Sequence, residues 1–391
     1  MSRYRLKPRP VQEAILLRHC MHARYVWNLA IEQYSWWRPG RGHAPRYGSQ
    51  AAQLTEARAE FGWLADGSQV VQQQALRDFA QAMANYYAGT HGKPTWRKEG
   101  RNEGFRIVAV RPGHIRRLSR NTGAVWIPKA GWVRFRWSRS TPAARSYRVT
   151  RDRAGRWHVA FTCIPIQIAG PGTGDVVGID RGVAVSAALS TGELLHCPGL
   201  RPAEQARLRL LQRRLARARK GSRRRGQVKA AIARLKARER DRRKDWAEKT
   251  STSLVRRFDL IRIEDLRITG MTRSARGTID RPGRGVRQKA GLNRGILASG
   301  WGLLARRLEE KAPGRVEKIS PAFTSQRCSA CGTVDGESRE SQADFACRSC
   351  GYACNADVNA AKNIAAGHAV TARGRSRLRE RVNREPQLLT S

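Results

Sequence analysis

Acidic residues are scarce in this sequence. Its 391 residues include 31 Asp and Glu against 76 Lys and Arg, which gives a net charge of +45 and an isoelectric point of about 11.5. A charge imbalance of this size favours a polyanionic partner, and nucleic acid is the polyanion that we expect. An anionic membrane surface is the alternative.

Long apolar segments are also missing. The sequence has no run of about 18 or more apolar residues, so no membrane-spanning helix and no membrane partner are expected. The first five residues, Met-Ser-Arg-Tyr-Arg, lack the apolar core of a signal peptide. We therefore expect an intracellular, cytoplasmic protein that associates with the nucleoid. Its length and its 40% of hydrophobic residues suffice for two or three domains with cores of their own.

Cysteine is present mainly as one pattern rather than as a disulfide framework. Cys328 and Cys331 form one Cys-x-x-Cys pair, and Cys347 and Cys350 form a second pair after 15 intervening residues. This spacing is typical of a tetrahedral zinc site, whereas disulfides are not expected in a chain without an export signal. A glycine follows each pair and allows the backbone to fold under the metal. We predict a structural zinc ion at these four thiolates, with Cys354 outside the site.

Three short segments each carry a carboxylate at a strand or helix end. Residues 176–180 and 260–264 are apolar, mostly β-branched runs that end on Asp180 and Glu264, and Asp357 opens an alanine-rich helix. One such strand end is usually just solvated. Three carboxylates at one sheet edge would repel each other unless divalent cations neutralise them. We predict that these three acids are catalytic and hold two Mg²⁺ ions, which clamp the attacking and leaving oxygens of a phosphodiester.

Two neighbours of these acids need separate treatment. Asp265 follows Glu264 directly, and strand alternation would turn its side chain to the opposite face, so we exclude it from the site. Asn359 lies two residues after Asp357 and is expected to hydrogen-bond a carboxylate of the site.

Each acid lies within a longer motif. Residues 177–183 (VGIDRGV) resemble the first motif of a RuvC-type nuclease, residues 263–266 (IEDL) the second, and residues 357–364 (DVNAAKNI) the third. In this order they resemble the TnpB family, which comprises transposon-encoded RNA-guided DNA endonucleases related to miniature type V CRISPR effectors. The resemblance implies a guide RNA and a target DNA as partners, with a monomer on one RNA.

The resemblance also implies a multi-domain α+β and α/β fold. An N-terminal wedge-like β-barrel would carry an inserted helical recognition region, and an RNase H-like RuvC domain would carry the zinc ribbon. Residues 4–8 and 93–96 resemble the family's wedge and recognition regions. The expected parts are the barrel at 1–14 and 104–170, the helical insert at 15–103, the RuvC domain at 171–324 and 353–367, the ribbon at 325–352, and a basic disordered tail at 368–391.

The most basic stretch is residues 201–250, with twenty Lys and Arg against five acids. Helically spaced leucines precede an interruption at 221–226, and further apolar residues at helical spacing follow it. We predict a basic helical hairpin that contacts nucleic acid, because like charges at this density destabilise a helix that lacks a polyanion. The alternative is a solvated charged helix face.

Two further expectations concern the segment that follows the second acid. Residues 270–291 are basic and glycine-rich and are expected to form a surface loop. Leu297, Trp301, Leu304 and Leu308 predict one amphipathic helix.

Three functions remain open at this point. The first is an RNA-guided, Mg²⁺-dependent DNA endonuclease encoded by a transposable element. The second is a compact type V CRISPR effector with the same chemistry, and the third is a non-catalytic nucleic-acid-binding transposon regulator whose acids are structural. A transposase is a weaker interpretation, because the resemblance is to an accessory transposon protein.

Overall fold

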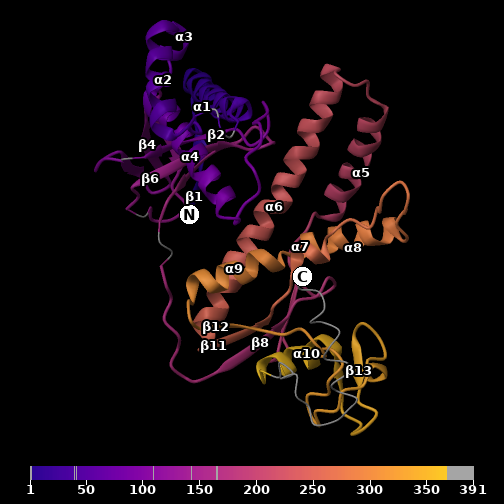
Figure 1. The fold of residues 1–391 in the computed structure, drawn as a ribbon. Coiled ribbons are helices and arrows are strands. Elements are labelled where there is room, and N and C mark those ends of the chain that lie inside the picture. Colours follow the sequence, from indigo (N-terminus) through magenta and orange to yellow (C-terminus); the bar gives the residue numbers. More distant parts are fainter. Residues whose placement is uncertain are drawn as a thin grey trace. The chain divides into compact units, whose positions relative to one another are not determined.

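The computed structural model describes residues 2–38, 40, 42–108, 110–141, 143–163 and 166–367. The chain forms two compact units, Met1–Ile164 with Leu208–Ala237, and Pro165–Arg207 with Arg238–Ser391. Figure 1 shows the elements of both units. The predicted disordered tail, residues 368–391, lies outside the described residues. Within the described part of the chain, no helix is both long enough and apolar enough to cross a membrane.

The first unit is built on one antiparallel sheet with the order β2-β6-β7-β1-β5-β4-β3. Its first strand lies in the middle because Arg5 and the residues before it pair with β7, whereas Leu6 and Lys7 pair with β5. The bounds are β1 Ser2–Lys7, β2 Gly104–Val108, β3 Ile115–Ser119, β4 Thr122–Ile127, β5 Gly131–Arg136, β6 Ser146–Arg151 and β7 Trp157–Phe161.

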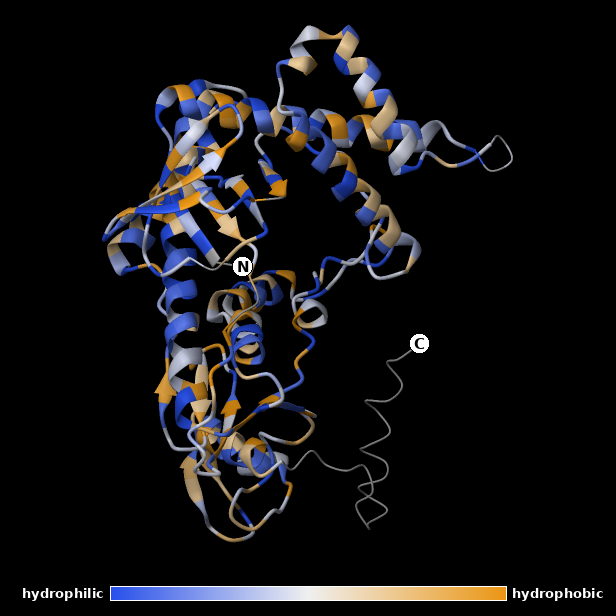
Figure 2. Cartoon of the chain, turned by 90° about the vertical axis from the view of Figure 1, so that its left-hand side faces the viewer, coloured by the Kyte–Doolittle hydropathy of each residue, from blue (hydrophilic) through white to orange (hydrophobic). Residues whose placement is uncertain are grey.

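Side chains alternate between the two faces of this sheet. In β5, Val133 and Phe135 are buried in the core, whereas Arg134 and Arg136 are exposed. Figure 2 shows several strands with hydrophobic residues along most of their length and mixed hydropathy along the helices. The sheet therefore has one face on the core and presents arginine on the other.

Four helices lie between β1 and β2 in the chain. They are α1 Pro10–Trp36, α2 Tyr47–Glu60, α3 Gly62–Ala65 and α4 Gln69–Tyr87. Helix α1 has proline in its first turn, where the missing N–H is not needed. The stripe of α1 that includes Leu16, Cys20 and Trp27 is buried against the core, together with Phe79 of α4. The helical segment begins at Pro10, five positions before the expected boundary at residue 15.

The second unit is built on a mixed sheet with the order β10-β9-β8-β11-β12. Strands β8, β11 and β12 run parallel, and β9 and β10 form an antiparallel hairpin beside β8. Gly192 provides the positive φ in the turn of that hairpin. The bounds are β8 Val176–Asp180, β9 Ala187–Leu189, β10 Leu194–Leu195, β11 Leu260–Glu264 and β12 Val316–Ile319.

Two expectations for the helices of this unit are wrong. Helix α8, Val286–Ser299, begins inside the segment 270–291 that was expected to be a loop. The single amphipathic helix is divided at Gly300, whose φ of 77° ends α8 and starts α9, Trp301–Lys311. The left-handed backbone conformation of Gly300 interrupts the helix, although the helical spacing of the apolar residues continues across this position. The short α7, Ile268–Met271, precedes them.

The basic hairpin consists of α5 Pro202–Arg217 and α6 Arg223–Arg257. Its helices contact each other through apolar residues that include Leu211, Val228 and Leu235, as the helical spacing predicts. The expected interruption at 221–226 is shorter in the structure, because α6 already begins at Arg223 and contains Gly226. Helix α6 also continues seven residues beyond the expected end at 250.

Candidate functional site

Two of the three predicted acids leave the sheet side by side. Strands β8 and β11 are parallel, with Ile179 opposite Ile263. Asp180 and Glu264 each follow by one residue, so both lie at the carboxyl edge of adjacent strands. This is the edge at which open α/β sheets collect their functional side chains.

The third acid reaches the same edge from helix α10, Ala356–Ala365. Helix α10 packs on β8. Its N-cap residue Asn355 accepts hydrogen bonds from the backbone N–H groups of Asp357 and Val358, which fixes the first turn. A β-carbon added to Gly182, just after β8, would lie 3.8 Å from Oδ2 of Asp357. Asp357 therefore lies beside the loop that follows Asp180.

The other two acids act electrostatically on Asp180. Desolvation, together with the charges of Glu264 and Asp357, raises the pKa of Asp180 to about 7. Glu264 and Asp357 are 7% and 9% exposed, and burial raises the pKa of each. Carboxylates with raised pKa values at one place form a site that gains from a bound cation.

Residues that the sequence analysis did not single out hold these acids. Thr324 donates a hydrogen bond of 2.7 Å from its hydroxyl to Oε1 of Glu264, which opposes the rise in the pKa of that carboxyl. The Arg181 guanidinium donates to the backbone carbonyl of Glu264. Arg339 forms an ion pair of 3.3 Å with Oδ1 of Asp357. No sequence signal separates Arg339 from the many other basic residues.

The two neighbours of the acids behave differently. Asp265 is exposed, and its backbone N–H donates to the carbonyl of Ile319 at the end of β12. The expectation for Asn359 is wrong. Its side chain is fully buried and binds backbone groups, donating to the carbonyl of Arg327 at 2.7 Å and accepting from the N–H of Ser329 at 2.9 Å. A buried amide satisfies both of its polar ends in this way.

The four predicted zinc ligands come together. The Sγ atoms of Cys328, Cys331, Cys347 and Cys350 all lie within 4.8 Å of one another, and all four thiols are free of disulfides. Two of the Sγ–Sγ distances are 3.6 and 3.7 Å. Tetrahedral Zn–S bonds of about 2.3 Å place sulfur atoms about 3.8 Å apart, whereas a disulfide requires about 2.05 Å. The cluster has the spacing of a metal site, and Cys354 is outside it.

The two cysteine pairs have the same backbone geometry. In the first, the N–H of Gly332 donates to the carbonyl of Cys328 at 2.9 Å, and in the second the N–H of Gly351 donates to the carbonyl of Cys347 at 2.9 Å. Both glycines have a positive φ, 77° and 71°. Each pair thus forms a tight turn that only glycine closes without strain, as the sequence analysis expected.

This cysteine module is tied to helix α10. Asn363, one turn after Asn359, donates to the carbonyls of Thr324 and Arg327. The two asparagines occupy the same face of α10, so the helix that carries Asp357 also holds the backbone entering the module. The cysteine module, helix α10 and Thr324, whose hydroxyl binds Glu264, form one connected hydrogen-bond network. The small strands β13 Asp344–Ala346 and β14 Ala353–Asn355 complete the module.

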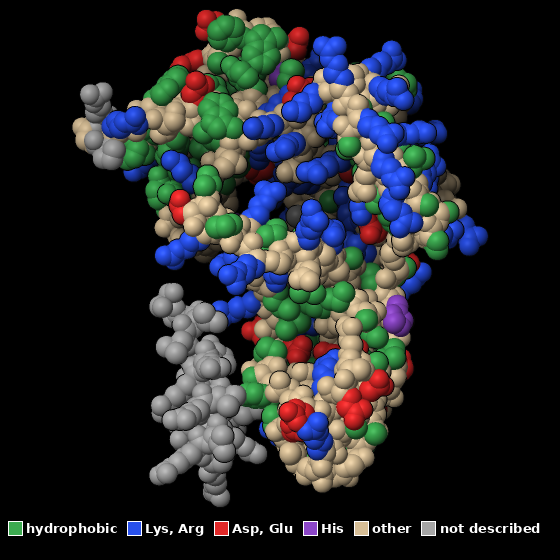
Figure 3. All heavy atoms as spheres, turned by 90° about the vertical axis from the view of Figure 1, so that its right-hand side faces the viewer, with side chains coloured by type: hydrophobic (Ala, Val, Ile, Leu, Met, Phe, Trp, Pro, Cys, Tyr) green, Lys and Arg blue, Asp and Glu red, His purple; other side chains and the backbone are tan. Residues whose placement is uncertain are grey.

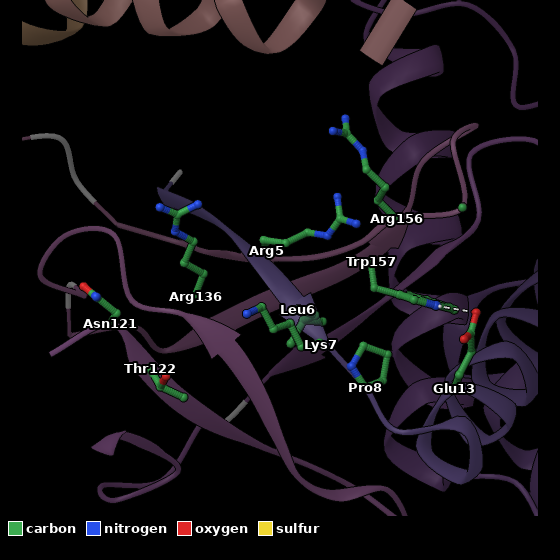
Figure 4. A pocket seen from close by; sticks show the side chains of 11 residues that line it. Arg5, Leu6, Lys7, Pro8, Glu13, Asn121, Thr122, Arg136, Arg156 and Trp157 are labelled. Atoms are coloured by element: carbon green, nitrogen blue, oxygen red, sulfur yellow. Dashed lines mark hydrogen bonds between the residues drawn. The ribbon is translucent and has the colours of Figure 1, made fainter. Parts of the chain in front are cut away.

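Parts of the surface of the chain are strongly basic. The face drawn in Figure 3 carries far more Lys and Arg side chains than acidic ones. In the first unit, a hollow of about 690 Å³ is lined by residues that include Arg5, Lys7, Arg136 and Arg156. Figure 4 shows the three arginines on one side of the strand that carries Arg5, around the same open space. Trp157 at its rim donates to Glu13 at 3.1 Å.

Three family models match parts of the chain. Residues 2–42 match a "Helix-turn-helix domain", residues 139–275 a "Probable transposase" family, OrfB of IS605, and residues 301–364 a "Cas12f1-like, TNB domain". In this structure, residues 10–36 of the first match form one unbroken helix.

Two curated relatives match the chain almost end to end. An Escherichia coli (strain K12) protein named "Putative RNA-guided DNA endonuclease InsQ" is 36% identical over 95% of this chain and 93% of its own. The chain belongs to the TnpB family. A second TnpB-like relative, from Streptomyces pristinaespiralis and named "Putative RNA-guided DNA endonuclease", is 32% identical over all of this chain and 96% of its own.

Similarity to Cas12f1 proteins is local in sequence and broad in fold. A Cas12f1 endodeoxyribonuclease of Sulfoacidibacillus thermotolerans is 59% identical over 56 residues, which are 14% of this TnpB-family chain and 13% of that protein. A solved Cas12f1 structure, a complex with sgRNA and target DNA, matches with a TM-score of 0.54 and 15% identity over 90% of this chain and 82% of that one. The TnpB-family chain therefore shares the mixed α/β fold of that protein.

Proposed function

We propose that this protein is an RNA-guided, Mg²⁺-dependent DNA endonuclease encoded by a transposable element. The names of the two full-length relatives support RNA guidance and DNA cleavage. The match to the OrfB family of IS605 supports the transposon context. Guide RNA and target DNA are accordingly the partners.

The observation that carries the catalytic part is that Asp180 and Glu264 end adjacent parallel strands and that Asp357 lies beside the loop after Asp180, where the charges of Glu264 and Asp357 raise the pKa of Asp180. Oxygen ligands of this kind suit Mg²⁺, and Asp180, Glu264 and Asp357 would hold two ions. Bound there, Mg²⁺ would lower the pKa of the attacking water and stabilise the leaving 3′ oxygen of the phosphodiester. Arg339, already paired with Asp357, adds a positive charge beside the scissile phosphate.

The sheet order of the second unit supports a RuvC assignment. An antiparallel hairpin on one side of β8 and parallel strands on the other is the arrangement that an RNase H-like domain requires. By the same resemblance, the seven-stranded sheet with its helices inserted after β1 corresponds to the wedge-like barrel and recognition region. The four-cysteine module corresponds to the zinc ribbon, with a structural role because four thiolates leave no open position for substrate.

The basic hairpin is assigned to nucleic-acid contact. Its apolar residues pack α5 against α6, and many of its arginines and lysines, including Arg213 and Arg217, are exposed. Few acids are available to neutralise them, and phosphates would do so.

The assignment is tested by expressing the protein with its native flanking DNA and sequencing the RNA that copurifies. One discrete RNA that maps to the end of the gene or its element is expected. The purified complex should cut DNA that matches the guide, and Asp180→Ala should abolish cutting while nucleic-acid binding is retained. Unchanged cutting by Asp180→Ala, Glu264→Ala and Asp357→Ala proteins would overturn the catalytic assignment.

A compact type V CRISPR effector is the second candidate. The local match to Cas12f1 favours it, but that match spans 14% of the chain, whereas the two full-length relatives are not named as CRISPR proteins. Copurified RNAs that share a repeat and differ in their spacers would select this candidate. A non-catalytic regulator fits less well, because burying three acids that repel one another destabilises the fold unless a cation is bound.

A further inference from the structure

The loop between α4 and β2, residues 88–103, contains the motif Lys93-Pro94-Thr95-Trp96, which the catalytic assignment leaves without a role. This loop has no regular secondary structure but is anchored on α1. Trp27 donates from its indole Nε1 to the carbonyl of Thr95 at 3.0 Å. Asn28 forms two hydrogen bonds to the backbone of Arg97, at 3.0 and 2.8 Å. The loop is thus held in a defined position on α1.

Arg97 is placed by these bonds in an unusual environment. Its guanidinium lies 3.7 Å from the centroid of the Trp27 ring, and the buried Trp27 also makes an edge-on contact with Phe79. Among the described residues, no hydrogen bond or ion pair of the Arg97 guanidinium is found. Burial and the nearby positive charge of Arg148 lower its pKa to about 10. The guanidinium is half-buried, and the charge of Asp78 opposes part of the lowering of its pKa. A guanidinium that stacks on tryptophan and has no hydrogen-bond partner among the described residues has its donors available for an anion.

The surroundings of Arg97 form a hollow of about 800 Å³. Lys93, Lys98, Arg101 and Arg148 line it together with Arg97, and no acidic residue belongs to the described lining. Trp96 lies at its wall and is 51% exposed, so much of its indole is open to solvent. Cationic side chains can bind the phosphate of a nucleotide, and an exposed indole beside them can stack on its base.

We propose that this hollow binds an unpaired nucleotide of a nucleic-acid strand, with Arg97 and Arg148 on its phosphate and its base stacked on Trp96. The inference rests on the proposed function in one respect only, that the protein binds nucleic acid. The strand is either the guide RNA or the target DNA, because both present the same phosphate and stacking chemistry. A free nucleotide offers only one phosphate group and base, whereas a strand also engages Lys93, Lys98 and Arg101 along its backbone.

The test uses the full-length protein and fluorescent 20-nucleotide single strands of RNA and of DNA. Trp96→Ala should weaken binding of the matching strand by roughly 5- to 100-fold, because one stacked base is lost. Trp96→Phe should recover most of that loss. Arg148→Gln should weaken binding and reduce the slope of log K against log salt by about 0.7, which corresponds to one lost phosphate contact on a single strand.

Matched controls separate this effect from general loss of charge or aromatic surface. Trp36 is 69% exposed on α1 and does not line the hollow, and Arg153 is exposed in the turn before β7. Trp36→Ala and Arg153→Gln should bind as the wild type does. An effect confined to the RNA strand assigns the site to the guide, and one confined to the DNA strand assigns it to the target.

The proposal would be overturned if Trp96→Ala and Arg148→Gln bound the RNA and the DNA strands as tightly as the two control variants do. Arg97→Gln is a further variant, and its melting temperature must be measured because Arg97 also packs on Trp27. The binding readout does not need cleavage. The same losses are expected in an Asp180→Ala background, so a failure of the nuclease assignment and a failure of this site give different results.

Discussion

A β-carbon on Gly178 would overlap the backbone carbonyl oxygen of Ala361 and the backbone amide of Ala365. Strand β8 and helix α10 can therefore pack as closely as they do only because residue 178 has no side chain. This packing carries Asp180 on the strand and Asp357 on the helix to the same edge of the sheet.

Gly178→Ala should separate α10 from β8. The atoms in the way belong to the backbone and cannot turn aside, so the free energy of unfolding should fall by about 1–3 kcal/mol. Cleavage should fall with it, because Asp357 moves relative to Asp180. Denaturant unfolding and a cleavage assay measure the two effects. Gly199→Ala is the control, since a β-carbon there meets nothing within 4 Å; equal behaviour of the two variants would contradict the close packing.

Asp180→Asn should stabilise the protein in magnesium-free buffer at pH 8. The pKa of Asp180 is raised to about 7 from its ordinary value of 3.8, so the folded state holds this proton more tightly than the unfolded chain. The stability of the wild type therefore falls as the pH rises from about 4 to 7, by on the order of a few kcal/mol. Asparagine does not ionise and avoids this loss.

Thermal melting of both proteins between pH 4 and pH 8 measures the difference, which should grow with pH. Mg²⁺ should raise the melting temperature of the wild type more than that of Asp180→Asn, because it neutralises the carboxylates. Asp265→Asn alters an exposed neighbour and should follow the wild-type curve. Parallel curves for Asp180→Asn and the wild type would argue against the buried acid cluster.

Cys347→Ser should remove bound zinc, whereas Cys354→Ser should not. Cys347 is one of the four clustered thiols, and Cys354 lies outside the cluster. Metal analysis of the purified proteins should find about one zinc per chain in the wild type and in Cys354→Ser, and almost none in Cys347→Ser. Wild-type protein without zinc would refute the metal assignment.

Asn359→Ala should destabilise the connection between the cysteine module and α10. The substitution leaves the partly buried backbone N–H of Ser329 without its partner and removes a donor to the carbonyl of Arg327, which costs about 1–3 kcal/mol. Unfolding experiments and limited proteolysis of the module measure the loss. Lys362→Ala, on the same helix, removes a bond of 2.9 Å to the Tyr352 hydroxyl near the surface and should cost less. An equal or smaller loss for Asn359→Ala would contradict its role as a buried link.

Arg213→Gln combined with Arg217→Gln should weaken nucleic-acid binding. Both residues are exposed on α5, away from the apolar contact with α6. If each contacts a phosphate, the slope of log K against log salt should fall by about 0.7–0.9 for each residue. The control Arg153→Gln with Arg348→Gln removes the same charge elsewhere. Identical slopes for both pairs would leave the hairpin without a specific role.

The motifs and the metal ligands could be predicted from the sequence because their signals are local. Two strands that end on Asp180 and Glu264, a helix that opens on Asp357, and four cysteines at fixed spacing each follow from residue type and periodicity. The alternation of Val133 and Phe135 with arginines is equally local. The break at Gly300 was missed because the apolar spacing continues through it and a glycine alone does not decide a helix end.

Only the tertiary structure decided which residues hold the site in place. Thr324 binds Glu264 and Arg339 pairs with Asp357 because the cysteine module folds back on the sheet edge. Arg97 stacks on Trp27 because a loop without regular structure is anchored by Asn28. These contacts join residues distant in sequence, and their partners are common residue types with many alternatives in a basic chain. The sequence determines the groups that do chemistry, whereas packing selects the groups that position them.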